Sequence, residues 1–213
     1  MKGLFITFEG PEGCGKTTQA RLLADVLESI GYDVILTCDP GGTEVGDKIR
    51  SVLLDAANNK IAALTELFLF LASRHQLVDE KIEKHLQAGN IVICSRYTDA
   101  TLVYQGYARG LDLDTLEKLN TFATKNVAPD LTILLDIDPE IGLKRVRDRY
   151  KSRNEELDRI EEEVMEFHHK VRDGYLELCS KEPRRIKKIN ADDTIENIQA
   201  QVKELVLDVL EKV

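Results

Sequence analysis

A glycine-rich segment near the N-terminus constrains this chain more than any other feature. Residues 10–17, Gly-Pro-Glu-Gly-Cys-Gly-Lys-Thr, match the pattern G-x-x-x-x-G-K-[ST]. The apolar run 4–8 before the segment predicts a strand, and the helical periodicity over 17–30 after it predicts a helix, with Leu22, Leu23, Val26, Leu27 and Ile30 on one face. Since a strand–loop–helix order is what a phosphate-binding loop requires, a chance glycine-rich turn is the weaker interpretation.

The chemistry of such a loop predicts roles for its residues. Its glycines let backbone N–H groups turn inward around phosphate oxygens, and the following helix N-terminus adds the positive end of a dipole. Lys16 is expected to reach the β- and γ-phosphates of a nucleoside triphosphate, with ATP the default, and the Thr17 hydroxyl to bind Mg²⁺. The expected ATP-binding residues are Gly10, Pro11, Glu12, Gly13, Cys14, Gly15, Lys16, Thr17 and Thr18.

Five strand-like runs alternate with helical patterns along the chain. They cover residues 4–8, 34–38, 91–94, 131–135 and 185–189, and the first four are nearly continuous apolar runs, as in parallel strands covered on both faces. The alternation predicts an α/β fold with a doubly wound, five-stranded parallel sheet flanked by helices. The 213 residues contain no linker or repeat and predict a single domain over 1–213. Apolar residues at helical spacing over 194–213 predict a packing helix without chemistry.

Composition and charge exclude several classes of protein. The net charge of -9 argues against a general nucleic-acid binder, and no apolar run approaches the roughly 20 residues that cross a bilayer. The first residues enter a strand directly instead of showing a signal-peptide layout, and the four cysteines lack C-x-x-C spacing. We therefore expect a cytoplasmic protein with reduced thiols and no nucleic-acid or membrane partner.

Charged residues follow the predicted strands, where bound molecules lie in such sheets. Asp39 follows the second strand, with Arg50 in the next helix, and Arg96 follows the third. Arg74 lies in the long helical stretch 58–88, whose middle is apolar nearly all round and therefore predicts burial in the core or in a subunit interface. Arginines in such places are usually surface residues, but beside a phosphate loop Arg50, Arg74 and Arg96 are expected to converge on a second anion.

A basic run over 144–153 stands out because the chain is acidic overall. Six of its ten residues are Lys or Arg. A solvated helix end is the alternative interpretation, but the position after a strand–helix unit predicts a short hinged lid over about 144–156 that places arginines on transferring phosphates. Two phosphate sites, a hydroxyl ligand for Mg²⁺ and a lid together indicate phosphoryl transfer, which relies on positioning and charge neutralisation.

Several segments together resemble the bacterial thymidylate kinases, which are nucleoside monophosphate kinases of the P-loop NTPase class, over essentially the whole length. The segments are the loop at 10–18, Pro-Gly-Gly-Thr at 40–43, Phe-Leu-Ala-Ser-Arg at 70–74, Arg-Tyr at 96–97, Tyr-Gln-Gly at 104–106, Pro-Asp at 129–130 and Leu-Asp-Arg-Ile-Glu at 157–161. The resemblance implies phosphorylation of dTMP to dTDP with Mg-ATP, and a homodimer formed through the 58–88 helix. Open alternatives are a kinase for dUMP or another pyrimidine nucleotide, a deoxynucleoside kinase, and a weakly catalytic nucleotide-binding homologue.

The resemblance also implies roles at the acceptor base and sugar. Phe70 would stack on thymine, although an apolar helix alone favours a core aromatic, and Arg74 would hydrogen-bond the base. Thr101 would contact the thymine edge. Tyr104 would pack on the sugar where a ribose 2′-OH would lie, and Asp39 and Gln105 complete the implied acceptor site.

At the phosphates, the resemblance implies that Arg50 and Arg96 hold the dTMP phosphate. Glu12 would bind the 3′-OH or a metal-bound water. The implied catalytic residues are Lys16, Arg96, Glu12 and one lid arginine among Arg147, Arg149 and Arg153.

The chain departs from the family pattern after two strands. The family normally has Asp-Arg-[Tyr/Phe] after the third strand, whereas this chain has Ser95 before Arg96, and Asp39 stands where a glutamate usually precedes Pro-Gly-Gly. The second change keeps the charge and the first does not. We hypothesise that Glu12, Glu9 or Asp136 supplies the missing negative charge near Mg²⁺.

Overall fold

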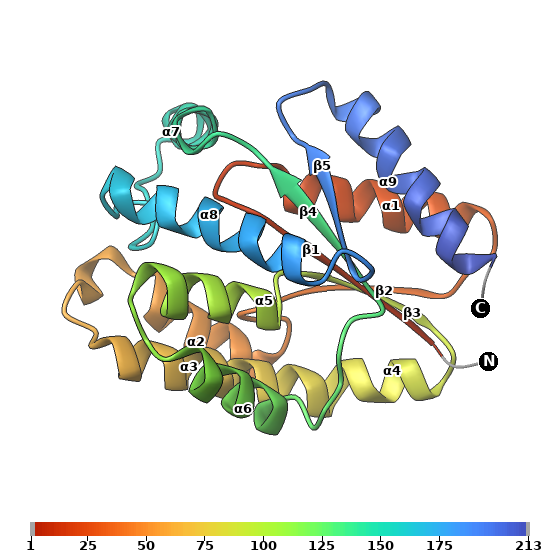
Figure 1. Ribbon diagram of the computed structural model, residues 1–213, viewed down its shortest axis with the longest axis horizontal. Coiled ribbons are helices and arrows are strands. Elements are labelled where there is room, and N and C mark those ends of the chain that lie inside the picture. The colour runs from red at the N-terminus through yellow and green to blue at the C-terminus, as the bar shows by residue number, and fades with distance from the viewer. Residues whose placement is uncertain (1–2, 212–213) are drawn as a thin grey trace.

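The computed structural model describes residues 3–211, which form a parallel sheet with helices on both faces (Figure 1). The strand order is β2-β3-β1-β4-β5, and every neighbouring pair is parallel. The strands are β1 (Leu4–Glu9), β2 (Val34–Cys38), β3 (Ile91–Ser95), β4 (Leu131–Asp136) and β5 (Ile186–Asn190). The predicted doubly wound, five-stranded fold is confirmed, and each predicted strand agrees to within one residue at either end.

Helices connect the strands in sequence. The longer ones are α1 (Lys16–Ser29), α2 (Glu44–Leu54), α3 (Ala63–Leu77), α6 (Leu113–Ala123), α7 (Pro139–Arg153), α8 (Met165–Lys181) and α9 (Ile195–Leu210). The shorter ones are η1 (Ala56–Asn58), the π-helical turn η2 (Val78–Ile82), α4 (Glu83–Gln87), α5 (Thr98–Thr101) and the π-helical segment η3 (Leu102–Ala108). None of them, within the part of the chain described, has the length and apolar character of a membrane span.

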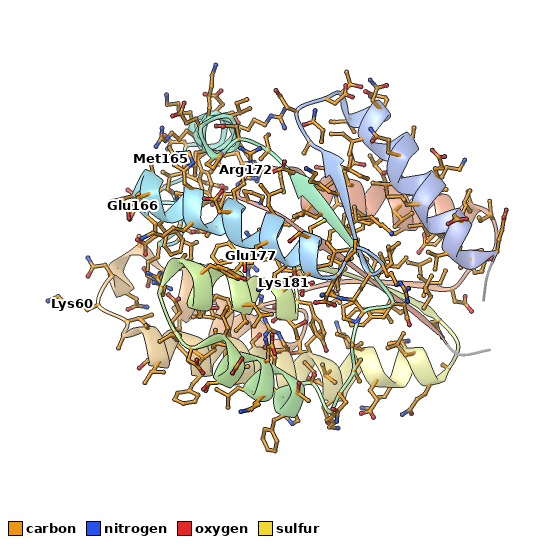
Figure 2. All side chains as sticks on the ribbon, viewed as in Figure 1. Lys60, Met165, Glu166, Arg172, Glu177 and Lys181 are labelled. Carbon is orange, nitrogen blue, oxygen red and sulfur yellow. The ribbon has the colours of Figure 1, made fainter. Side chains whose placement is uncertain are left out.

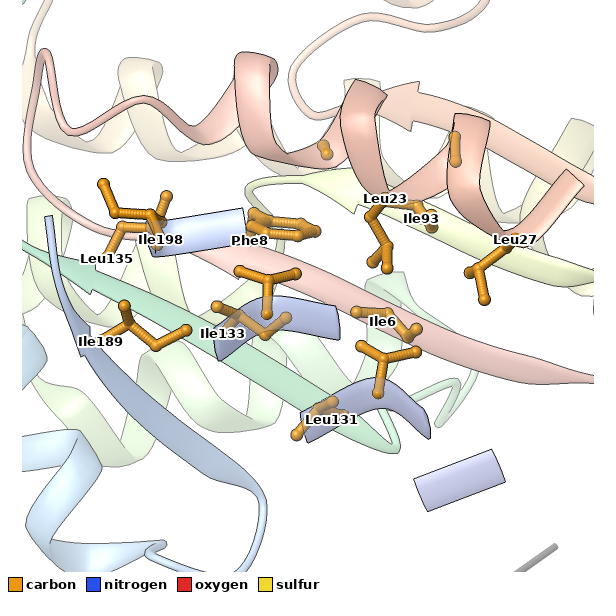
Figure 3. Close-up of a cluster of buried hydrophobic side chains, with 14 of the residues drawn as sticks. Ile6, Phe8, Leu23, Leu27, Ile93, Leu131, Ile133, Leu135, Ile189 and Ile198 are labelled. Carbon is orange, nitrogen blue, oxygen red and sulfur yellow. The ribbon is translucent and has the colours of Figure 1, made fainter. Parts of the chain in front are cut away.

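Two apolar layers cover the sheet. On one face, Ile6, Phe8 and Ile133 pack against Leu23 and Leu27 of α1 and against the buried side of α9 (Figure 3). The other face divides into a cluster around Phe5 and Val92 beneath α3 and η2, and a cluster around Leu134 and Ile186 beneath α8 and η3. Because both faces are covered, the inner strands β1, β3 and β4 are buried along almost their whole length and consist mainly of apolar residues.

The buried side of α1 differs from the predicted one. Ala20, Leu23, Ala24 and Leu27 are buried, whereas Leu22 and Val26 are half-buried. Ile30 lies just past the helix end and is 54% exposed. Two alanines let the helix approach the sheet closely, so small residues carry part of the contact predicted for larger ones.

The helical stretch predicted over 58–88 is shorter and interrupted. It starts at Ala63, passes through the π-helical turn η2 and ends at Gln87. Asn58 ends the 3-10 helix η1, and Asn59 lies in the turn that follows it, since asparagine side chains favour turns over helix interiors. Within α3, Leu67 and Leu71 are buried, while Leu64 and Phe68 are more than half exposed. Among residues 3–211, one side of this apolar helix is therefore covered and the side with Leu64 and Phe68 is not.

The β4–α7 connection meets the phosphate loop closely. Pro139 lies in the first turn of α7, and the Asp138 side chain caps the helix by accepting from the Glu140 N–H at 2.9 Å. A Cβ on Gly13 would lie 2.0 Å from the Gly142 carbonyl oxygen, so the loop and α7 touch through their backbones. Arg172 of α8 (Figure 2) pairs with Asp136 at the end of β4 and holds α8 over the same edge.

Candidate active site

A cavity of about 660 Å³ lies at the carboxyl ends of the strands, where such sheets bind ligands. Its walls come from helices and loops that are far apart in the sequence. They include residues 12–19, 39–40, Arg50, Leu54, Phe70, Arg74, Arg96, 100–101, 104–105, Arg145, 149–150, Asp158, 160–161, 193–195 and Ile198. Most residues predicted for the site therefore share one cavity.

The phosphate loop forms one wall. The Lys16 Nζ donates to the carbonyl oxygens of Gly10 and Pro11, both at 2.8 Å, and lies 3.4 Å from the Cys14 Sγ. Gly10 and Pro11 are thus behind the wall, where their carbonyls position the lysine. The hydroxyl-bearing residues Thr17 and Thr18 begin α1 and are exposed to the cavity. This arrangement presents helix N–H groups, a hydroxyl and an ammonium to one anion.

A charged cluster joins the loop to the end of β3. Arg96 forms an ion pair with Glu12, and the Tyr104 hydroxyl donates to the same Glu12 oxygen at 2.8 Å. The Arg96 guanidinium also lies 5.8 Å from the Tyr104 ring centroid, within cation–π range. Burial alone would raise the pKa of Glu12, but the nearby positive charges of Arg96 and Lys16 lower it to about 2. Glu12 is therefore ionised at neutral pH and orients both neighbours.

Arg74 forms the floor of the cavity and is only 1% exposed. Its Nε donates to Asp39 at 2.5 Å and its Nη1 to the Thr101 hydroxyl at 2.7 Å and to Asn120 at 2.6 Å. Its Nη2 donates to the Tyr97 carbonyl at 3.0 Å, so four of its five N–H groups are engaged. Arg74 lines the same cavity as Arg50 and Arg96, and these internal contacts fix the direction of its guanidinium; its convergence with them on a second anion stays a prediction.

Asn120 supports Arg74 from outside the cavity lining, and sequence reasoning missed it. It lies on α6 between the buried Leu116 and Ala123, and its amide nitrogen donates to the Thr98 carbonyl at 3.2 Å. A polar residue on an otherwise apolar helix face needs hydrogen-bond partners when it is buried. The asparagine between apolar residues of the α6 sequence could therefore have indicated a buried hydrogen-bonding role.

The side wall contains the remaining acceptor residues. Phe70 is half-buried and lines the cavity, and Arg50 lines it while donating to the Pro40 carbonyl at 2.8 Å. Gln105 is 1% exposed, and Glu66 accepts from its amide at 2.8 Å. Glu66 lies one helical turn before Phe70 and was not predicted.

The basic run 144–153 lies entirely within α7. That helix is unbroken to Arg153 and ends at Asn154, which adopts a left-handed conformation with φ 54°. Arg149 lines the cavity and pairs with Glu161 at 3.2 Å, whereas neither Arg147 nor Arg153 lies among the residues lining it. Arg149 is therefore the best placed of the three lid candidates.

The far end of the cavity was not predicted. Asp193 and Thr194 follow β5, and Ile195 and Ile198 lie in the first turn of α9, so the predicted packing helix also borders the cavity. Arg145 closes this end by donating to the Ala191 carbonyl at 2.9 Å. Bound molecules in such sheets lie at the carboxyl ends of the strands, and β5 is one of these strands. The same rule, applied to the residues after β5, would have predicted that residues 193–195 line the site.

The donor atoms present fit Mg²⁺ carried by phosphate oxygens. Within residues 3–211 no group of three or more His, Cys, Asp or Glu residues is arranged to hold a metal alone. Thr17 and Glu12 line the cavity, and Mg²⁺ at phosphate sites takes few protein ligands. Of the three carboxylates proposed to offset Ser95, Asp136 is paired with Arg172 and Glu9 is buried behind the wall. Glu12 is thus the candidate with access to the cavity.

Comparisons with known proteins agree with this geometry. The thymidylate kinase family model matches residues 8–202. A thymidylate kinase of Pelobacter propionicus is 47% identical, covering 94% of this chain and 92% of the relative, and one of Clostridium novyi is 44% identical, covering 95% and 97%. A crystal structure of thymidylate kinase from Ehrlichia chaffeensis superposes with a TM-score of 0.79 at 32% identity, covering 97% of this chain and 99% of that one. The chain belongs to the thymidylate kinase family.

Proposed function

We propose that this chain transfers the γ-phosphoryl group of ATP to dTMP and releases ADP and dTDP. The observation that carries the proposal is that two compartments share one cavity. The phosphate loop forms one wall, and an acceptor compartment lined by Phe70 and arginines forms the other. A shared cavity lets two nucleotides meet with their phosphates adjacent, as in-line transfer requires.

The acceptor compartment fits a pyrimidine deoxynucleotide. Phe70 offers a ring face for stacking, and Arg74 and Thr101 offer polar groups to the base edge from the floor. Tyr104 is 5% exposed and tied to Glu12, so its ring is a rigid surface against the sugar that disfavours a 2′-OH. Arg50 and Arg96 lie where they can hold the acceptor phosphate.

The donor compartment supplies charge neutralisation. Lys16 and the N-terminus of α1 bind the β- and γ-phosphates, and Arg149 reaches the transferring group from α7. Arg145 and residues 193–195 border the space left for the donor base. When bound at the Thr17 hydroxyl, Mg²⁺ offsets negative charge on the phosphate oxygens. Transfer is then a matter of alignment, since no covalent enzyme intermediate is needed.

A coupled assay of ADP release tests the proposal with dTMP, dUMP, UMP and thymidine as acceptors. We expect turnover with dTMP, weaker turnover with dUMP and little with UMP or thymidine. Lys16→Ala is expected to abolish transfer, because the triphosphate loses its central positive charge. Binding of ATP without turnover of any acceptor contradicts the proposal, and preference for thymidine favours a nucleoside kinase.

We further propose that the chain forms a homodimer through the exposed side of α3. Leu64 and Phe68 lie one turn apart on that side and are 56% and 57% exposed. Val45 and Val52 of the neighbouring α2 are also exposed. An apolar face of this kind on a helix that is otherwise packed is typical of a subunit contact.

A further inference from the structure

Glu9 is a buried carboxylate that the proposed reaction does not use. It is the last residue of β1, directly before the phosphate loop, and its side chain has no exposed surface. One oxygen accepts from the backbone N–H of Tyr97 at 2.7 Å, and the other accepts from the Tyr175 hydroxyl of α8 at 2.7 Å. The carboxylate thus connects three parts of the chain that converge behind the cavity.

The backbone that Glu9 holds is in an uncommon conformation. Arg96 has a φ of 68°, in the left-handed region that residues other than glycine seldom adopt. Two contacts from β1 flank it, because the Phe8 carbonyl accepts from the Arg96 N–H at 2.9 Å and Glu9 accepts from the next N–H along the chain. Such a conformation persists only where its surroundings impose it.

The left-handed backbone conformation at Arg96, called the Arg96 turn below, sets the direction of the Arg96 side chain. With the backbone held, the guanidinium reaches Glu12 and the Tyr104 ring at the cavity wall. Tyr175 supports the same wall, since its ring packs edge-on against Tyr104 with centroids 6.3 Å apart. Glu9 therefore hydrogen-bonds both to the backbone next to Arg96 and to Tyr175. Tyr175 in turn packs against Tyr104, the ring that the Arg96 guanidinium covers.

We propose that Glu9 is a positioning residue that fixes the Arg96 turn for the acceptor phosphate. The role follows from geometry, because the carboxylate accepts from the N–H that directly follows the left-handed Arg96 residue. It rests on the proposed function in so far as Arg96 holds the dTMP phosphate. Glu9 is fully buried and is not among the residues lining the cavity, so its role is to position Arg96 and not to contact substrate.

Calorimetric binding of dTMP and of ATP to Glu9→Ala and Glu9→Gln tests the role. Alanine leaves the Tyr97 N–H without an acceptor, so we expect dTMP affinity to fall by about tenfold or more and ATP affinity to change less than about threefold. Glutamine is expected to stay within about threefold of wild type for both, because its carbonyl can accept from Tyr97 and its amide can donate to Tyr175.

Tyr97→Phe is the matched control for a loss of stability. It removes the hydrogen bond from the Tyr97 hydroxyl to the Val127 carbonyl, at 3.0 Å, and keeps the ring and the N–H that Glu9 holds. We expect a lower Tm with unchanged dTMP affinity. Equal weakening of dTMP binding in this control and in Glu9→Ala overturns the positioning role.

Further outcomes separate this inference from the proposed function. Wild-type affinity for dTMP in Glu9→Ala, or a loss in Glu9→Gln as large as in Glu9→Ala, overturns the positioning role alone. A wild type that binds ATP and not dTMP contradicts the proposed function. If Glu9→Ala does not fold, Tyr175→Phe carries the test. We expect it to weaken dTMP binding by more than about threefold, and a smaller change overturns the role.

Discussion

At the scale of single residues, two glutamates three positions apart have opposite acid–base behaviour. Burial raises the pKa of Glu9 to about 7, with the negative charge of Asp99 adding to the effect. Burial also opposes ionisation of Glu12, but the positive charges of Arg96 and Lys16 outweigh it and lower that pKa to about 2. The difference comes from neighbours that folding supplies, since both residues have the same intrinsic pKa.

This contrast predicts how stability depends on pH. The pKa of Glu9 is higher in the folded state than its ordinary 4.5, so its contribution to stability is present below that value and is lost as pH rises towards 7. The Glu9→Gln variant has an uncharged side chain at every pH, so it does not lose this stability as the pH rises. We expect the Tm of the variant to rise relative to wild type between pH 5 and pH 8, as measured by thermal unfolding.

Glu12→Gln is the control for that measurement. The pKa of Glu12 is lowered, so its contribution is present above 4.5 and lost only towards pH 2. The Tm difference between Glu12→Gln and wild type is expected to stay constant between pH 5 and pH 8. A Glu9→Gln difference that is equally constant contradicts the raised pKa of Glu9.

Phe70 tests the acceptor compartment. Base–aromatic stacking contributes about 1–3 kcal/mol in nucleic-acid sites, so Phe70→Ala is expected to raise KM for dTMP roughly 5- to 150-fold and to change kcat less. Steady-state kinetics with varied dTMP measure this. Leu69→Ala is the control, since Leu69 is a half-buried neighbour that is not among the residues lining the cavity. An unchanged KM in Phe70→Ala contradicts the stacking role.

At the scale of elements, one buried carboxylate joins α3 to the segment after α7. Glu66 accepts from Arg159 at 2.6 Å and from Arg109 at 2.7 Å, and Arg159 also donates to the Leu53 carbonyl at 2.9 Å. Asp158, Ile160 and Glu161, around Arg159, line the cavity. These contacts hold the segment 157–161 against the acceptor compartment.

Removing Arg159 should loosen that segment. Glu66 keeps Arg109 as a partner in Arg159→Ala, so we expect a loss of about 1–3 kcal/mol in the free energy of unfolding. We also expect a several-fold higher KM for dTMP. Chemical denaturation and steady-state kinetics measure the two effects. Lys125→Ala, which breaks an exposed pair with Asp79, is expected to change neither. A KM in Arg159→Ala equal to that of wild type contradicts the coupling.

At the scale of the whole molecule, the proposed homodimer can be tested through its apolar face. Phe68→Glu places a charge on the exposed side of α3 and is expected to shift the protein from dimer to monomer in analytical ultracentrifugation. Ile30→Glu changes a residue of similar exposure, 54%, beyond the end of α1 and is expected to leave the dimer intact. A wild-type monomer, or a dimer that survives Phe68→Glu, contradicts the proposed interface.

The sheet and the phosphate loop were predictable because their signals are local. Continuous apolar runs mark buried parallel strands, and the loop is contiguous, so its strand, glycines and helix occur in a fixed order. The acceptor residues 70, 74, 101 and 104 were predicted through family resemblance, not from spacing alone. Helix details were less predictable, since the start of α3 at Ala63 depends on a turn that periodicity does not encode.

The sequence by itself determined the fold class, the phosphate loop and the family. Only the tertiary structure decided which polar residues support the site: Glu9 beneath Arg96, Asn120 beneath Arg74, and Glu66 beside Gln105. Their partners are 39 to 88 residues away along the chain. The physical reason is that a buried polar group must find a hydrogen-bond partner wherever packing places one, and no local pattern records that place.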